Sequence, residues 1–236
     1  MVNDFFVAAA FYDALTGKAG DRWAERTVKT VRRFAPNPRG ADVGCGTGKV
    51  TRALSAAGFS VVGFDPSPEM LGEATLRGSG ELYVLGGMKA VGKLNGLGFV
   101  TAVNDVVNYI RPQDLEKNFA AVHVALAEGG AFLFDLSTPH RLRRVIGENL
   151  FGEDLDDLTY LWFNKQKKDG VLMEVVYFLK KGDSYEKKED VFFEYAHESA
   201  AVVSALRNAG FGKISVKGKK GAPAEDEERL FFTAVK

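Results

Sequence analysis

The sequence predicts an α/β protein built on a doubly wound, mostly parallel sheet of seven strands. Short apolar strands alternate with helical segments over most of the 236 residues. This alternation is typical of βαβ units, which place helices on both faces of the sheet. A glycine-rich turn, "DVGCGTG", joins the first strand to the following helix. Such turns lie at the carboxyl ends of the strands, where sheets of this kind bind ligands.

Two helices are expected ahead of the sheet. The apolar residues of "DFFVAAAFYDALTG" and "DRWAERTVKTVRRFA" recur at helical spacing, with Asp21 as the N-cap of the second helix and Pro36 just beyond its end. The alternating elements then follow in order: strand 40–43, helix 48–57, strand 60–65, helix 67–77, strand 81–86, strand 98–103, helix 113–127 and strand 130–136.

An antiparallel insertion is expected after the fifth strand. The segments "LTYLWFNKQ" and "GVLMEVVYFLKKGDSYEKKEDVFFEYA" read as successive strands, joined by the hairpin-type turns "KKDG" and "KKGD". The doubly wound pattern then resumes with helix 198–209, which ends before Gly210, and with strands 211–217 and 229–235.

The composition excludes several classes of protein. The 31 basic and 31 acidic residues leave no net charge, so bulk electrostatics indicate neither a nucleic acid nor an acidic membrane as partner. A single cysteine, Cys45, rules out an intramolecular disulfide and fits a reducing compartment. No stretch approaches the roughly 20 apolar residues of a membrane-spanning helix. We therefore expect a cytoplasmic protein.

The spacing of the glycines argues against phosphate binding. In a dinucleotide fingerprint that starts at Gly44, the third glycine would stand at position 49, which is Lys49. A P-loop needs four residues before its Gly-Lys pair, but only three separate Gly44 from Gly48. The remaining pattern is Asp-x-Gly-x-Gly-x-Gly, followed by Asp65 at the end of the next strand.

A nucleoside with a cationic tail fits this pattern better than a pyrophosphate. The Asp65 carboxylate suits a pair of ribose hydroxyls, as the corresponding acid does in dinucleotide-binding folds. The glycines allow the backbone to approach a bulky ligand closely. Asp42, two residues ahead of the first glycine, offers a charge partner to a cation.

"DVGCGTG" together with "VVGFDPSPEML" resembles the signature of class I S-adenosylmethionine-dependent methyltransferases. "FYDALTG", "NDVVNYI", "FLFDLSTP" and "ERLFF" resemble a small bacterial and archaeal branch of that family. The resemblance implies a Rossmann-like methyltransferase fold with S-adenosyl-L-methionine as cofactor. It implies that Gly44, Gly46 and Gly48 pass beneath the methionine moiety and that Asp65 binds the ribose.

The resemblance also divides the chain. A single methyltransferase domain over 1–236 would comprise N-terminal helices at 1–36, a cofactor-binding core at 37–150, an antiparallel insertion over the acceptor site at 151–197, and a C-terminal helix with the last two strands at 198–236. The residues expected to bind the cofactor are Tyr12, Asp42, Gly44, Cys45, Gly46, Gly48, Asp65, Pro66, Met70, Gly87, Met88 and Asn104.

The chain departs from the family at two acids. Gly87 stands where the branch usually has an acid that contacts the adenine amino group, within a Gly-Asp-Met triplet. Gly98 stands where a second acid is common in strand four. Losing one hydrogen bond to adenine would weaken cofactor binding by roughly 1 to 3 kcal/mol. Backbone groups of Gly87 and Met88 could still form hydrogen bonds with the edge of the adenine. The side chains of Met70 and Met88 either cover the face of the adenine or pack in the core.

Methyl transfer needs alignment of donor and acceptor more than a dedicated catalytic group. If the acceptor loses a proton, the candidate bases are Asp105, Asp135, His140 and His197, each of which also has a structural interpretation. The three histidines and one cysteine supply no metal-ligand spacing. Aromatic residues of the insertion either cover the acceptor pocket or form a dimer contact: Trp162, Phe163, Tyr177, Tyr185, Phe192, Phe193 and Tyr195.

The sequence thus predicts methyl transfer to a small molecule by a monomer or homodimer. Two other functions stay open. Gly87 and Gly98 favour a relative that binds a nucleoside or a partner protein without turnover. The basic patches "KQKK" and "RLRR" favour an RNA methyltransferase, although acids interrupt them and strand four lacks an Asn-Pro-Pro-Tyr type stretch.

Overall fold

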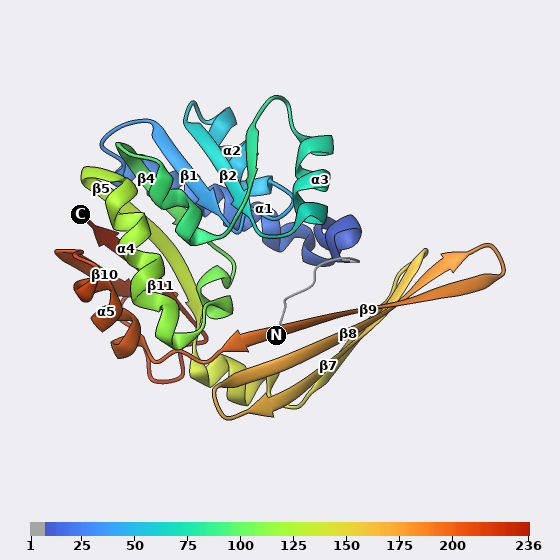
Figure 1. The fold of residues 1–236 in the computed structure, drawn as a ribbon. Helices are drawn as coiled ribbons and strands as arrows, with labels where there is room; N and C mark the ends of the chain where they lie inside the picture. Colours follow the sequence, from blue (N-terminus) through green and yellow to red (C-terminus); the bar gives the residue numbers. More distant parts are fainter. Residues whose placement is uncertain (1–7) are drawn as a thin grey trace.

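The computed structural model describes the backbone of residues 8–236, with the side chains of that range except those of 8 and 14–19. A seven-stranded sheet forms the centre, in the order β10-β11-β5-β4-β1-β2-β3 (Figure 1). Its strands are β1 (Arg39–Val43), β2 (Ser60–Asp65), β3 (Leu82–Leu85), β4 (Leu97–Ala102), β5 (Leu126–Ser137), β10 (Lys213–Lys217) and β11 (Arg229–Val235). The pairs among β1 to β5 are parallel, and only β11 and β10 run antiparallel at one edge. The expected Rossmann-like methyltransferase fold is confirmed.

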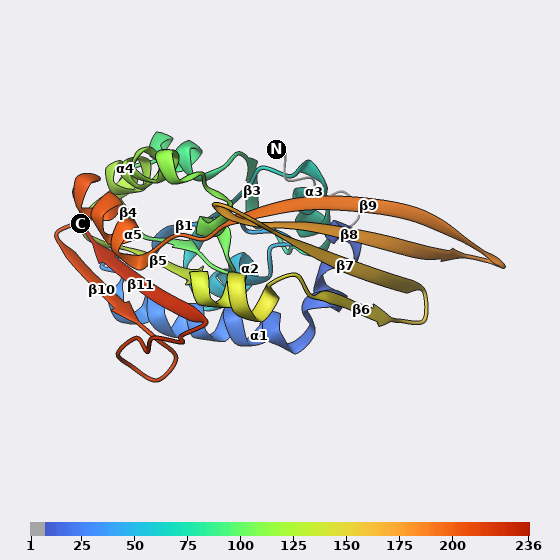
Figure 2. The same cartoon turned by 90° about the horizontal axis from the view of Figure 1, so that it is seen from below.

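Helices cover both faces of this sheet. They are α1 (Ala8–Phe34), α2 (Lys49–Ala56), α3 (Pro68–Arg77), α4 (Leu115–Ala125) and α5 (Ser199–Asn208). Short helical turns occupy Met88–Lys93, Val106–Tyr109, Pro112–Asp114 and Arg141–Ile146. Figure 2 shows α1 and α4 on opposite sides of the sheet. No described helix is long and apolar enough to cross a membrane.

The N-terminal region differs from the two helices expected. A single helix, α1, runs without interruption through both apolar segments, and residues 4–7 at the expected start lie outside the described residues. The side chains of Ala24 and Val31, in the second half of the helix, are buried. Asp21, expected to begin a new helix, instead lies mid-helix and pairs with Lys49 of α2 at 3.1 Å. Tertiary packing here overrides the local capping signal.

The small residues of β1 have a packing reason. A Cβ atom on Gly40 would lie 2.2 Å from the ring of Phe99 on the neighbouring strand β4. Phe99 is fully buried and stacks edge-on against Phe59. One large aromatic ring therefore fills the space that aliphatic side chains would fill on an ordinary first strand.

The insertion forms a sheet of its own, called here the insertion sheet: β6 (Leu150–Asp154), β7 (Leu158–Lys167), β8 (Gly170–Lys181) and β9 (Ser184–Tyr195). All its pairs are antiparallel, and the two hairpin turns lie where the sequence predicts them. The far end of the sheet extends well beyond the body of the molecule (Figures 1 and 2). Strand β6 was not expected, because its five residues are all exposed and show no apolar alternation.

Candidate functional site

A cavity of about 540 Å³ lies between the carboxyl ends of the central strands and the insertion sheet, and is called here the main cavity. This volume is within the roughly 300 to 1,000 Å³ of small-molecule pockets. The central fold lines it with Tyr12, Val43, Gly44, Gly46, Asp65, Pro66, Met70, Gly87, Met88, Asn104, Asp105, Val106, Tyr109, Ile110, Asn118 and Arg229. The residues that follow β5 line it with Arg141, Tyr160, Trp162, Met173, Val175, Tyr177, Phe192 and Glu194.

The three glycines of the turn after β1 all adopt positive φ angles, of 64° at Gly44, 53° at Gly46 and 79° at Gly48. They serve different purposes. A Cβ on Gly44 would lie 2.4 Å from Val106, and one on Gly48 would lie 2.4 Å from the Tyr83 hydroxyl. At Gly46 the nearest atoms are 3.9 Å away or more. Two glycines therefore permit tight packing, and Gly46 presents bare backbone to the cavity.

Asp65 fixes this turn and faces the main cavity. Its two carboxylate oxygens accept the backbone N–H groups of Gly46 at 2.8 Å and Ser67 at 2.9 Å. The residue is 7% exposed, and burial raises the pKa of its carboxyl against the opposing effect of these two hydrogen bonds. Each oxygen keeps acceptor capacity for a ligand. A carboxylate so placed beside a bare glycine turn fits a ribose with vicinal hydroxyls.

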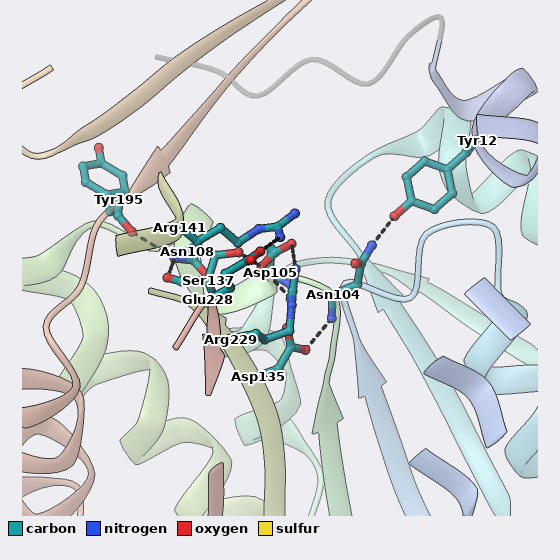
Figure 3. A network of polar contacts seen from close by, with 10 residues as sticks. All are labelled: Tyr12, Asn104, Asp105, Asn108, Asp135, Ser137, Arg141, Tyr195, Glu228 and Arg229. Atoms are coloured by element: carbon teal, nitrogen blue, oxygen red, sulfur yellow. Dashed lines mark hydrogen bonds and ion pairs between the residues drawn. The ribbon is translucent and has the colours of Figure 1, made fainter. Parts of the chain in front are cut away.

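The N-terminal helix is tied to the same turn. The Thr47 hydroxyl donates to Asp13 at 2.7 Å. The Asn104 side-chain amide, which follows β4, donates to the Tyr12 hydroxyl at 2.7 Å (Figure 3). Burial raises the pKa of Tyr12 to about 12, so its hydroxyl stays protonated at neutral pH. Both Tyr12 and Asn104 line the main cavity.

The two departures from the family pattern differ in kind. Gly87 lines the main cavity, and a Cβ at this position would meet no atom within 4 Å. An acid would therefore fit there. At Gly98 a Cβ would lie 2.2 Å from the backbone oxygen of Asn37. Close passage of the chain thus requires glycine at position 98, whereas position 87 has no such packing reason.

Three residues expected at the cofactor lie outside the lining of the main cavity: Asp42, Cys45 and Gly48. Asp42 is 1% exposed and accepts hydroxyl hydrogen bonds from Thr51 at 2.8 Å and Thr101 at 2.7 Å. It joins β1 to α2 and β4 rather than meeting a cation across open space. Cys45 is buried, and burial raises the pKa of its thiol far above the ordinary value, which suits an inert filler.

Asp105 and Asp135 share one arginine that sequence reasoning missed (Figure 3). Arg229 donates two hydrogen bonds to Asp105, at 2.7 and 2.8 Å, and also pairs with Asp135. Asp105 further accepts the Ser137 hydroxyl at 2.6 Å. Asp135 is fully buried, so only Asp105 and Arg229 reach the cavity lining. Neither carboxylate is free to act as a simple base.

Neither candidate histidine lines the main cavity. His197 is 4% exposed, and its Nε2 lies 3.0 Å from the carbonyl oxygen of Ile110. Burial lowers the pKa of His197, so a neutral ring donates to that carbonyl. His140 directly precedes the turn at Arg141–Ile146. The structure therefore does not bring the two histidines to the site where the sequence hypothesis placed a base.

One face of the insertion sheet lines the cavity. Its lining residues alternate along the strands: 160 and 162 on β7, 173, 175 and 177 on β8, and 192 and 194 on β9. Of the aromatic residues expected here, Trp162, Tyr177 and Phe192 belong to this face. Phe163 and Tyr185 are 38% and 61% exposed. Phe193 and Tyr195 line a second cavity, of about 450 Å³, beside Gly87.

Sequence reasoning also missed Tyr109, Arg141 and Glu194, which line the main cavity. The alternation that selects Trp162 and Phe192 would have selected Glu194, two residues beyond Phe192 on β9. Arg229 had a weaker signal, as a charged residue at the start of an otherwise apolar strand. No local pattern singles out Tyr109 or Arg141.

Comparisons with known proteins find similarity to methyltransferases. A family model described as "Methyltransferase domain" matches residues 41–130. The chain is 27% identical to a putative methyltransferase of Bacillus subtilis (strain 168), over 97% of this chain and 95% of the relative. It is 26% identical to an S-adenosylmethionine-dependent methyltransferase from Clostridium acetobutylicum of known structure, covering 96% of each chain with a TM-score of 0.85.

A more distant structure shares the fold. The amino pentose methyltransferase CalS10 from Micromonospora echinaspora, solved with S-adenosylmethionine bound, is 20% identical, covers 100% of both chains and gives a TM-score of 0.78. The fold, the glycine turn with Asp65 and the full-length similarity to methyltransferases all agree. The chain is a class I S-adenosylmethionine-dependent methyltransferase, with S-adenosylmethionine as its cofactor.

Proposed function

We propose that the chain methylates a small molecule, which it holds in the main cavity under the insertion sheet. The observation that carries the proposal is the continuity of this cavity. One continuous cavity of about 540 Å³ joins the glycine turn and Asp65 to the aromatic face of the insertion sheet. Cofactor and acceptor can therefore meet without crossing bulk solvent. The insertion, 151–197, then supplies the acceptor site, as its sequence position suggests.

The central fold holds the cofactor in this proposal. Asp65 accepts the ribose hydroxyls, and the backbone of Gly44 and Gly46 supports the methionine portion. Pro66, Met70, Gly87 and Met88 surround the adenosine, and all four line the cavity. Tyr12 and Asn104 close the opposite side, joined by their hydrogen bond. The bound cofactor supplies an electrophilic methyl group on a sulfonium.

Alignment of the methyl donor with the acceptor supplies most of the rate acceleration in this proposal. In-line displacement needs the acceptor atom at contact distance behind the methyl carbon, in a pocket that excludes water. Asp105 is held by Arg229 and Ser137, which suits it to orient the loop after β4 rather than to move protons. The fully buried Asp135 supports the same loop from below.

A small acceptor fits the volume of the main cavity better than a polynucleotide does. The chain carries no net charge, and the acceptor side of the cavity is built largely from aromatic and apolar side chains. CalS10, whose fold this chain shares, is an amino pentose methyltransferase. That similarity supports a small-molecule acceptor.

Binding of S-adenosylhomocysteine to Asp65 variants tests the proposed cofactor site. Asp65→Ala should weaken binding about a hundredfold in isothermal titration, because two charge-assisted hydrogen bonds are lost. Asp65→Asn, which keeps one acceptor oxygen, should bind S-adenosylhomocysteine with an affinity between those of the parent protein and Asp65→Ala. Asp226→Asn, on the exposed loop before β11, is the control and should bind like the parent protein. Unchanged affinity in Asp65→Ala would overturn the assignment.

Acceptor size has its own test. Incubation with S-adenosylmethionine and a fractionated extract of small molecules should give methylated product in a fraction below the size of a short oligonucleotide. Product found only in RNA would contradict the small-molecule proposal.

A further inference from the structure

A buried carboxyl group lies on the acceptor side of the main cavity. Glu194, on β9, is 6% exposed and is the single acid that the insertion sheet contributes to the lining. The Tyr109 hydroxyl forms a hydrogen bond with it. Among the described residues, no lysine, arginine or histidine nitrogen is paired with Glu194 within 4.0 Å. Buried carboxylates are ordinarily paired with a cation.

The two arginines that line the cavity are committed elsewhere. Arg229 is held by Asp105 and Asp135. Arg141 pairs with Glu228 at 3.0 Å, on the loop before β11. At longer range both arginines lower the pKa of the Glu194 carboxyl, but burial, reinforced by the negative charge of Asp105, raises this pKa to about 8. A ligand cation would complete the pairing that the described residues leave open.

The walls around this carboxyl suit a cation. Tyr160, Trp162, Tyr177 and Phe192 line the same cavity from the same sheet face. Aromatic faces attract ammonium groups, and the attraction grows as the site loses water. A carboxylate together with several aromatic rings distinguishes a cationic group from a neutral or anionic one of the same shape.

One donor in this wall also lacks a partner. The indole Nε1 of Trp162 is buried and has no hydrogen-bond partner among the described residues. Buried indole N–H groups usually find an acceptor. Because Trp162 lines the cavity, an oxygen of the bound molecule would satisfy it. The acceptor side of the main cavity thus offers one carboxyl group, which a bound cation would keep ionised, together with one hydrogen-bond donor and aromatic walls.

We propose that Glu194 selects an amine as methyl acceptor, binding its ammonium form and taking one of its protons. This inference rests on the proposed function and names the substrate class for the same site: an amine that also carries an oxygen within reach of Trp162. The aromatic walls favour a molecule with an apolar body.

The proton moves from the ammonium nitrogen to a carboxylate oxygen of Glu194, which leaves a neutral amine with a free electron pair. That pair forms the bond to the methyl carbon as the carbon–sulfur bond breaks and its electrons stay on sulfur. The products are a methylated ammonium and a neutral thioether, and Glu194 returns its proton to solvent. A carboxyl with a raised pKa suits this step, because it lies closer to the acidity of the amine.

Three probes of matched shape test the selection: tyramine, with an ammonium group, tyrosol, with a hydroxyl in its place, and 3-(4-hydroxyphenyl)propionate, with a carboxylate. Their affinities are measured by isothermal titration with saturating S-adenosylhomocysteine at about pH 8.5, where the Glu194 carboxyl is mostly ionised and the amine of tyramine is still protonated. Tyramine should bind at least about tenfold more tightly than tyrosol, and the carboxylate most weakly. In Glu194→Gln the affinities for tyramine and tyrosol should become nearly equal, and the affinity for S-adenosylhomocysteine should stay unchanged.

Glu189→Gln, an exposed position on the same strand, is the matched control and should keep the ammonium preference. The comparison of the three probes on the unsubstituted protein stands even if a variant fails to fold. Equal binding of tyramine and tyrosol, no tyramine binding at millimolar concentration, or a preference that survives in Glu194→Gln would each overturn the proposal. Absent binding of S-adenosylhomocysteine would instead overturn the proposed function, so the two failures are distinct.

Discussion

The carboxylate of Asp135 accepts the backbone N–H of Asn104 at 2.6 Å, from beneath the loop that follows β4. Asn104 and Asp105 are consecutive non-glycine residues with positive φ, of 67° and 69°. This backbone conformation costs on the order of 1 kcal/mol or more per residue. Asp135, held in turn by Arg229, stabilises the strained turn that presents Asn104 to Tyr12 and to the cavity.

Asp135→Asn should therefore destabilise the fold. Arg229 keeps its two hydrogen bonds to Asp105. The substitution replaces one of the two buried Asp135 oxygens, which accept from Asn104, Asp105 and Arg229, with an amide donor. At least one buried donor then loses its acceptor, which costs about 1 to 3 kcal/mol. Urea unfolding followed by circular dichroism measures the change. Asp183→Asn, on an exposed hairpin turn of the insertion sheet, should change the free energy of unfolding by less than about 0.5 kcal/mol. Equal effects of the two substitutions would show that Asp135 does not hold the loop.

Gly87→Asp should tighten cofactor binding. The position lines the cavity and has open space for a Cβ, so the new carboxylate reaches the ligand without a clash. One added hydrogen bond to an amino group is worth roughly 1 to 3 kcal/mol, or about one to two decades in affinity for S-adenosylhomocysteine. Gly87→Ala adds the Cβ without the carboxylate and should leave the affinity close to the parent value. Similar affinities for both variants would mean that the adenine lies away from residue 87.

Gly98→Ala should destabilise the fold. Its Cβ would meet the backbone of Asn37 at 2.2 Å, and overpacking of this kind costs about 1 to 3 kcal/mol of stability. Gly212→Ala is the matched control, because no atom lies within 4 Å of its added Cβ and its φ is not positive. Thermal unfolding of the two variants measures the difference. A Gly98→Ala protein as stable as Gly212→Ala would show that the chain passes this glycine less closely.

The stability contributed by Asp42 should depend on pH. Burial raises the pKa of this carboxyl to about 6, above its unfolded value of about 3.9, despite the hydroxyl hydrogen bonds from Thr51 and Thr101. Its contribution is therefore fully present below about pH 4 and is lost as the pH rises through about 6. Asp42→Asn does not titrate, so its stability relative to the parent protein should rise from about pH 4 to pH 7, by up to about 3 kcal/mol. Urea unfolding at several pH values measures this, and a constant difference would contradict it.

The pattern of apolar residues was enough to predict the central sheet. Strand β2 was predicted to the residue, because "SVVGFD" is a buried run bounded by polar residues. The glycine turn and Asp65 were also found from local spacing, since both lie at the ends of neighbouring parallel strands. The expected site residues Gly46, Asp65, Met70 and Asn104 indeed line one cavity.

Partners distant in the sequence could not be predicted. Arg229 lies 124 residues from Asp105 and 94 from Asp135, and only the pairing of β11 with β5 brings them together. The two candidate bases therefore looked free in the sequence. The continuity of α1 was missed for a similar reason, because contacts with other elements decide whether a local cap ends a helix.

The four strands of the insertion pair only with one another, and the seven central strands form a separate ladder among the residues described. In the proposed function, the insertion sheet selects the acceptor and the central sheet binds the cofactor, so the two tasks fall to separate sets of strands on either side of the main cavity. Mutations that reshape the acceptor wall need not shift the register of the strands around Asp65. Substitutions confined to residues 150–195 could therefore change which acceptor is methylated while the cofactor-binding strands stay the same.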